Sequence, residues 1–268
     1  MTLRKLPAFS LFVVLLFAIS VPFWLAGGWV DRLLPRSIPI ALPFSALMTF
    51  CPALIASALL FRKDGWAGVK ALWRRVFDIR RIASKTWLAV AVLAMPAVLL
   101  ASFMLMRMSG YDLSGAHVAW SMAPLLFGLF FVGAAGEELG WQGFAFGLLE
   151  KRHTVFESAL VLGAVWAAWH VVPYFQTGHD ALWVAWQCVV TVFLRVVTVW
   201  LFAYGGRSVF LAILFHAMCN VSMFLFPNYG SLYDPATTAL VLAVFTAAIA
   251  AVWGPRMMQT SVAVPAPL

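Results

Sequence analysis

Charged residues are scarce in this sequence. Only 10% of its 268 residues are Asp, Glu, Lys or Arg and 64% are hydrophobic, against about 25% charged and 45–50% apolar in an ordinary soluble domain. Mean hydropathy is correspondingly high, at +0.95. A water-soluble fold cannot bury so much apolar surface, so the composition predicts an integral membrane protein.

Cysteine, internal repeats and soluble-sized insertions are also lacking. The three cysteines, Cys51, Cys188 and Cys219, form no CxxC pair, and we interpret them as small packing residues. Without repeats or insertions, the chain is expected to form a single membrane domain over residues 1–268. No HExxH motif is present either.

What the sequence does have is long apolar runs. A transmembrane helix needs about 20 apolar residues, and eight runs qualify. They are 8–27, 38–61, 87–106, 117–148, 155–174, 181–204, 208–226 and 236–254. We therefore predict an all-α, polytopic membrane helix bundle of about eight transmembrane helices, whose first run is a retained span rather than a signal peptide. Pro173 is expected to kink or end the fifth span.

The 18 basic residues sort by side of the membrane. With the N-terminus inside, fourteen fall in inner segments and three, Arg32, Arg36 and Arg107, in outer loops. The positive-inside rule then places both termini in the cytoplasm. Residues 62–86 alternate apolar and basic side chains at near-helical spacing, which predicts a cytoplasmic interfacial amphipathic segment. A solvated basic loop is the alternative.

Ionisable and amide side chains inside the spans are the main anomaly, because an intramembrane charge is costly and indicates function by default. They are Glu137, Glu138, Gln142, His170, Arg195, His216 and Asn220. At about 1.5 Å of rise per residue, most lie roughly 13–20 Å from the cytoplasmic end of their span. We expect the fourth, fifth and seventh spans to bring them to one polar cavity.

The spacing of these residues indicates hydrolytic chemistry. Glu138 and Gln142 are four residues apart, as are His216 and Asn220, so each pair shares a helix face. A carboxylate that activates water, a histidine that orients it and donors for an oxyanion are the parts of a peptide hydrolase. A structural role stays open for each group. The alternatives are ion pairing for the two glutamates, core packing for His170, interhelical hydrogen bonding for His216 with Asn220, and a counter-ion role for Arg195.

At these residues the sequence resembles the CPBP family of intramembrane proteases, which includes type II CAAX prenyl endopeptidases and a bacterial Abi/bacteriocin-processing branch. The family motifs EExxxR, FxxxH and HxxxN read here Glu137-Glu138 with Gln142, Trp166 with His170, and His216 with Asn220. The resemblance covers a catalytic core of about residues 120–225.

The resemblance implies that Glu137 and His170 activate water and that His216 and Asn220 hold the oxyanion. It also implies that Glu138 pairs with the motif's arginine, but Gln142 stands in that position. Either Gln142 bonds a neutral Glu138 or Arg195 supplies the charge. Trp166 in place of phenylalanine is expected to matter little.

Metal use stays open at this point. Glu137, His170 and His216 would make a His₂Glu set for zinc or another divalent metal. The motifs do not require a cofactor, and we favour a site without a bound metal.

The resulting prediction is an intramembrane endopeptidase that cleaves a membrane-associated peptide or lipidated protein by glutamate-activated water. Its expected partners are that substrate and membrane lipids, not nucleic acid, and its expected location is the bacterial cytoplasmic membrane. The alternatives are a catalytically degenerate scaffold or immunity protein and a proton-coupled transporter. The lack of an inverted repeat weakens the transporter.

Overall fold

The computed structural model describes residues 7–33 and 43–259, and within these ranges it contains helices and no β-strand. Seven described helical segments are long and apolar enough to span a membrane, and a shorter apolar helix, α8 (Val209–Leu225), accompanies them. The prediction of an all-α, polytopic membrane bundle is confirmed. The basic residues Arg4, Lys5 and Arg36 and the start of the predicted span 38–61 lie outside the described ranges.

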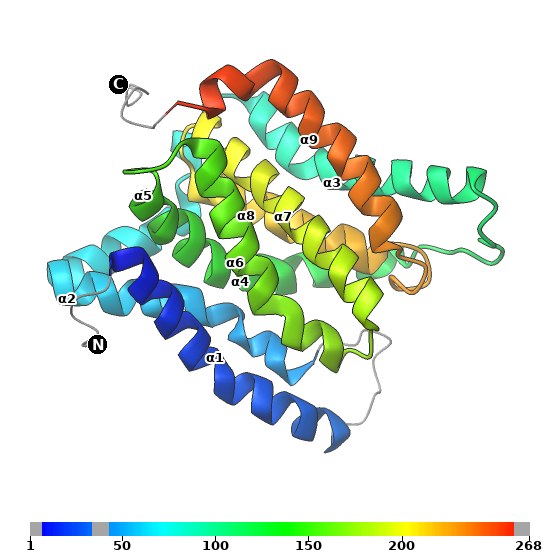
Figure 1. Ribbon diagram of the computed structural model, residues 1–268, viewed down its shortest axis with the longest axis horizontal. Helices are drawn as coiled ribbons and strands as arrows, with labels where there is room; N and C mark the ends of the chain where they lie inside the picture. Colours follow the sequence, from blue (N-terminus) through cyan, green and yellow to red (C-terminus); the bar gives the residue numbers. More distant parts are fainter. Residues whose placement is uncertain (1–6, 34–42, 260–268) are drawn as a thin grey trace.

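The long helices follow the predicted spans. They are α1 (Ala8–Leu33), α2 (Cys51–Arg74), α3 (Lys85–Met108), α4 (Ala123–Gly140), α6 (Val155–Gln176), α7 (Ala181–Tyr204) and α9 (Pro235–Met257). Figure 1 shows α1 and α2 along one edge of the bundle and α3 with α9 along the opposite edge. Helices α4, α6, α7 and α8 lie between these edges, so the motif-bearing segments are the central ones.

Short helical turns connect or extend the long helices. They are η2 (Phe44–Phe50), η3 (Arg75–Phe77), η4 (Ile79–Arg81), η5 (Trp120–Met122), the π-helical turn η6 (Trp141–Ala145) and α5 (Phe146–Leu149). The predicted fourth span is thus interrupted by η6 directly after the two glutamates. π-Helical turns occur mostly at functional sites.

Two local expectations differ from the structure. The predicted segment 62–86 is not one helix, because α2 runs on to Arg74 across a kink at Gly65, whose φ is 62°. Two 3₁₀ turns and the start of α3 at Lys85 complete the segment. Pro173 neither ends nor interrupts α6, which continues to Gln176, since a proline so near the C-terminal end breaks little of the hydrogen-bond ladder.

Polar caps begin four of the helices in the second half of the chain. Thr154, Asp180, Ser208 and Asp234 each accept a hydrogen bond from a backbone N–H in the first turn of the following helix. Asp78, from the connection between α2 and α3, also accepts from the backbone N–H groups of Val209 and Phe210. These caps satisfy helix-end donors that lipid would leave unpaired.

Glycines allow α4 to lie directly against the α2 segment. A Cβ on Gly140 would stand 2.3 Å from the Cβ of Pro52, and one on Gly136 would stand 2.8 Å from the carbonyl oxygen of Thr49. In the same way Gly163 on α6 admits the backbone of α7 near Arg195. Small residues are the usual means of close helix approach in membranes, and here they bring η2 and α7 to the two glutamates.

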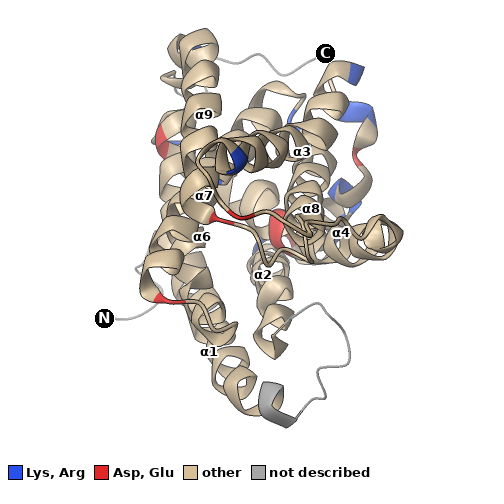
Figure 2. Cartoon of the chain, turned by 90° about the vertical axis from the view of Figure 1, so that its right-hand side faces the viewer, with Lys and Arg blue, Asp and Glu red and all other residues tan. Residues whose placement is uncertain are grey.

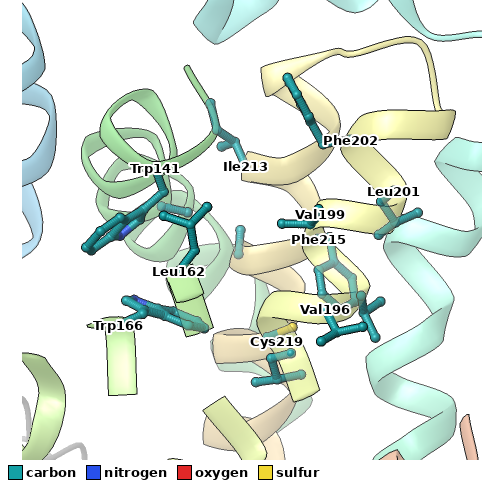
Figure 3. Packing of buried hydrophobic residues seen from close by; sticks show 14 of the residues in the cluster. Trp141, Leu162, Trp166, Val196, Val199, Leu201, Phe202, Ile213, Phe215 and Cys219 are labelled. Carbon is teal, nitrogen blue, oxygen red and sulfur yellow. The ribbon is translucent and has the colours of Figure 1, made fainter. Parts of the chain in front are cut away.

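The core consists of apolar and aromatic side chains from these central helices. Figure 3 shows Trp141 and Trp166 near Leu162, with Phe215, Val196 and Val199 packed beside them. Figure 2 shows helices that carry few charged residues along most of their length. The few buried charged side chains therefore stand out against an apolar interior.

Candidate active site

Glu137 lies near the end of α4 and is surrounded by neutral hydrogen-bond donors. Its Oε2 accepts from the indole N–H of Trp166 at 2.7 Å and, more weakly, from that of Trp141 at 3.4 Å. Its Oε1 lies 3.1 Å from the hydroxyl of Thr49. The side chain is buried, with 5% exposed, so these donors replace the water that would otherwise solvate the carboxylate.

Glu138, the next residue, faces a cation. Nη1 of Arg195 on α7 donates to both carboxylate oxygens, at 3.0 and 2.8 Å, and both residues are fully buried. Nδ1 of His216 on α8 lies 2.8 Å from Oε1 of the same carboxylate. A buried charge is tolerated when it is paired and hydrogen-bonded, and Arg195 gives Glu138 that pairing.

Trp166 connects the two glutamates with the two histidines. The guanidinium of Arg195 lies over its ring at 4.1 Å, within the range of a cation–π interaction. Its ring meets those of His170 and His216 edge-on, with centroids 5.4 and 5.1 Å away. Residues from four helices, α4, α6, α7 and α8, therefore meet around one indole.

The hydrogen bonds of the histidines define their tautomers. Nδ1 of His170 lies 2.9 Å from the backbone carbonyl of Trp166, and a carbonyl only accepts, so Nδ1 carries the proton. Nδ1 of His216 donates in the same way to the carboxylate of Glu138. Both imidazoles therefore leave Nε2 free of these bonds, as in sites where a carboxylate or carbonyl orients a working histidine.

The polar cluster becomes more accessible toward His170 and Asn220. Glu137, Glu138 and His216 are buried, whereas His170 and Asn220 are half-buried. Asn220 lies one turn beyond His216 on α8, and no hydrogen bond of its side chain is found within the described residues.

Comparison with known proteins identifies this helix set. The family model described as "Type II CAAX prenyl endopeptidase Rce1-like" matches residues 118–222, a range that runs from before Glu137 to just beyond Asn220. A curated relative, "CAAX prenyl protease 2" of Methanococcus maripaludis, is 26% identical over 228 residues, covering 80% of this chain and 83% of the relative. Residues 118–222 of this chain are thus similar to the type II CAAX prenyl endopeptidases, which supports an intramembrane protease of the CPBP type. The resemblance inferred from the three motifs is thereby confirmed.

The departure of this sequence from the CPBP arginine motif has a structural counterpart. Gln142, on the π-helical turn, is buried, and neither its amide nitrogen nor its oxygen has a partner within the described residues. The expectation that Gln142 bonds Glu138 therefore differs from the structure, because Arg195 and His216 occupy that carboxylate. The positive charge comes from α7 instead of α4.

A metal centre is not assembled from the described side chains. Among them, no group of three or more His, Cys, Asp and Glu residues is placed to hold a metal ion. The predicted set of Glu137, His170 and His216 does not fit one as arranged, because both oxygens of Glu137 face protons donated by Thr49 and the indoles.

Three functional contacts were missed from the sequence. Thr49 lies 84 residues before Gly133, whose carbonyl it contacts at 2.9 Å, and nothing in the motif spacing links it to Glu137. The sequence offers no role for the indole N–H of Trp141, and tryptophan in place of phenylalanine at position 166 is expected to matter little. The signal available was the replacement of the motif phenylalanine by tryptophan, since tryptophan adds an N–H donor to an otherwise apolar ring.

Proposed function

We propose that this intramembrane protease hydrolyses a peptide bond of a membrane-associated peptide or lipidated protein by means of water activated by Glu137. The single observation that carries the proposal is the placement of Glu137. Within residues 7–33 and 43–259 no cation is bound to this buried carboxylate, whereas the adjacent carboxylate has one. A carboxylate held by neutral donors keeps its capacity to accept a proton.

In this mechanism Glu137 takes a proton from the attacking water and later passes it to the leaving amine. A carboxylate offers about four acceptor positions, and three donors approach Glu137, which leaves room for a water. Nε2 of His170 accepts a hydrogen bond from the remaining O–H of that water and orients the water toward the scissile carbonyl.

The oxyanion that forms on the scissile carbonyl is assigned to Asn220 and His216. The amide of Asn220 donates directly. His216 donates through Nε2 when it carries both protons, and Glu138 at its Nδ1 compensates the added charge. Preorganised donors of this kind contribute on the order of 10²–10³ in rate.

The substrate class follows from the relatives. The curated relative is called a CAAX prenyl protease, so the first substrate to test is a prenylated peptide that ends in a CAAX motif. The same peptide without its prenyl group serves as the second arm. Cleavage of both peptides would indicate a broader membrane-peptide specificity. The bacterial cytoplasmic membrane stays our prediction for the location.

The test is cleavage by purified protein in vesicles, with Glu137→Gln as the decisive variant. Loss of the base is expected to lower kcat by about 10²–10⁴ while thermal unfolding stays near that of the wild type. The matched control is Glu157→Gln, an exposed capping-box residue of α6 that glutamine can replace. Full activity of Glu137→Gln would contradict the mechanism, and absence of cleavage by the wild type would favour the scaffold.

A further inference from the structure

Trp166 makes a contact that the aromatic residue of the family motif would not make. Its ring contacts with His170, His216 and Arg195 need only an aromatic surface. Its indole N–H, by contrast, donates to Oε2 of Glu137 at 2.7 Å. Phenylalanine at this position would keep the first set of contacts and lose the last.

The other donors to Glu137 are weaker. The indole of Trp141 lies 3.4 Å from the same oxygen, at the long end of the hydrogen-bond range. The hydroxyl of Thr49 has one proton and lies closer to the carbonyl of Gly133, at 2.9 Å, than to Glu137, at 3.1 Å. Trp166 is therefore the shortest donor among the described contacts of this carboxylate.

We propose that Trp166 is a positioning residue that acts through Glu137, fixing the carboxylate by the hydrogen bond from its indole N–H to Oε2. This inference rests on the proposed function of Glu137 as the base. The physical reason is that a buried carboxylate without a cation depends on its donors to stay charged. The indole is held in place by its contacts with three helices. Its N–H bonds Glu137 of α4, and its ring lies under Arg195 of α7 and beside His216 of α8.

The test compares Trp166→Phe with Trp169→Phe in the full chain. Trp169 is a matched control because it also lies on α6, is fully buried and packs against His170, with ring centroids 4.9 Å apart. Its indole donates to the hydroxyl of Ser20 at 2.8 Å instead of to Glu137. Each variant loses one buried indole N–H and keeps an aromatic ring.

For Trp166→Phe we expect the acidic limb of the kcat/KM profile on the prenylated CAAX peptide to move to higher pH by about one unit, because a carboxylate that loses a charge-assisted donor takes up a proton more readily. Trp169→Phe should leave that limb in place. Identical limbs for wild type and Trp166→Phe, or an equal shift in Trp169→Phe, would overturn the assignment.

A second measurement does not depend on turnover. Infrared titration of the carboxylic C=O band that is absent in Glu137→Gln reports the protonation of Glu137 itself. Its midpoint should rise in Trp166→Phe and stay unchanged in Trp169→Phe, whether or not the peptide is cleaved. An unmoved midpoint overturns the role of Trp166, whereas a moved midpoint in a protein without peptidase activity would count against the proposed function alone.

Discussion

Glu137 and Glu138 are neighbours in the chain and occupy opposite environments. Glu138 is fully enclosed and paired with Arg195 from α7 and His216 from α8. Glu137 is held by a hydroxyl from η2 and by indole N–H groups from η6 and α6, none of which carries a charge. Successive side chains on a helix point about 100° apart, so the two carboxylates reach different sets of helices.

The difference separates stabilisation from reactivity. A cation in contact with a carboxylate lowers its tendency to take up a proton, which suits a residue that orients His216 and does not suit a base. Neutral donors hold a carboxylate in place at a smaller cost to its basicity. The contacts from α7 and α8 therefore stabilise Glu138 in a supporting role. The contacts from η2 and α6 hold Glu137, the proposed base.

Among the changes that separate the two carboxylates, removal of Arg195 should lower the stability of the protein the most. Arg195→Gln leaves Glu138 buried without its cation, and loss of one partner of such a pair costs about 3–5 kcal/mol. Thermal and denaturant unfolding in detergent would measure the loss. The control is Arg256→Gln, because Arg256 also lies over an indole, that of Trp253 at 5.1 Å, but on an exposed stretch of α9. The control should cost less than about 1 kcal/mol.

A charge swap sharpens the same test. In the Arg195→Gln background, Gln142→Arg returns the arginine to the place that the family motif gives it. Recovery of stability and cleavage is expected if a side chain at position 142 can reach Glu138 from the π-helical turn. A double variant as unstable as Arg195→Gln alone would mean that an arginine at position 142 does not pair with Glu138 in this chain.

Gly140→Ala should have an intermediate effect, confined to the side of Glu137. The new Cβ would stand 2.5 and 2.6 Å from the carbonyl carbon and oxygen of Pro52, so α4 and α2 must separate. Overpacking of this kind costs about 1–3 kcal/mol, and separation would draw η2 and Thr49 away from the carboxylate. Gly128→Ala on the same helix has no heavy atom within 4 Å of its Cβ and should be neutral or stabilising. Equal stability of the two variants would contradict the close approach.

Thr49→Val should have the smallest effect. Its hydroxyl proton is shared between Gly133 and Glu137, so its loss is expected to cost about 1 kcal/mol and to lower kcat less than about tenfold. Steady-state kinetics would measure this. Thr246→Val serves as the control, since that hydroxyl bonds carbonyls of its own helix, α9. A loss of activity as large as that of Glu137→Gln would show that Thr49 is a main donor and would revise the comparison.

The sequence by itself determined the membrane class, the all-α bundle and the set of polar residues inside the spans. These follow from apolar run length and from the cost of burying charge, which are local properties of the chain. Even α7 was bounded correctly, at Ala181–Tyr204. The motif spacing then indicated the resemblance to the CPBP family, and its four-residue intervals place each pair of side chains on one helix face.

Only the tertiary structure decided which donor serves which carboxylate. Helix rotation and tilt depend on packing, so the sequence could offer both Gln142 and Arg195 to Glu138 but could not choose between them. The contact of Thr49 with Glu137 depends on Gly136 and Gly140, which let two helices far apart in sequence touch. The indole of Trp166 gained its role in the same way. Its N–H was evident in the sequence, and only the packing of α6 against α4 aimed it at Glu137.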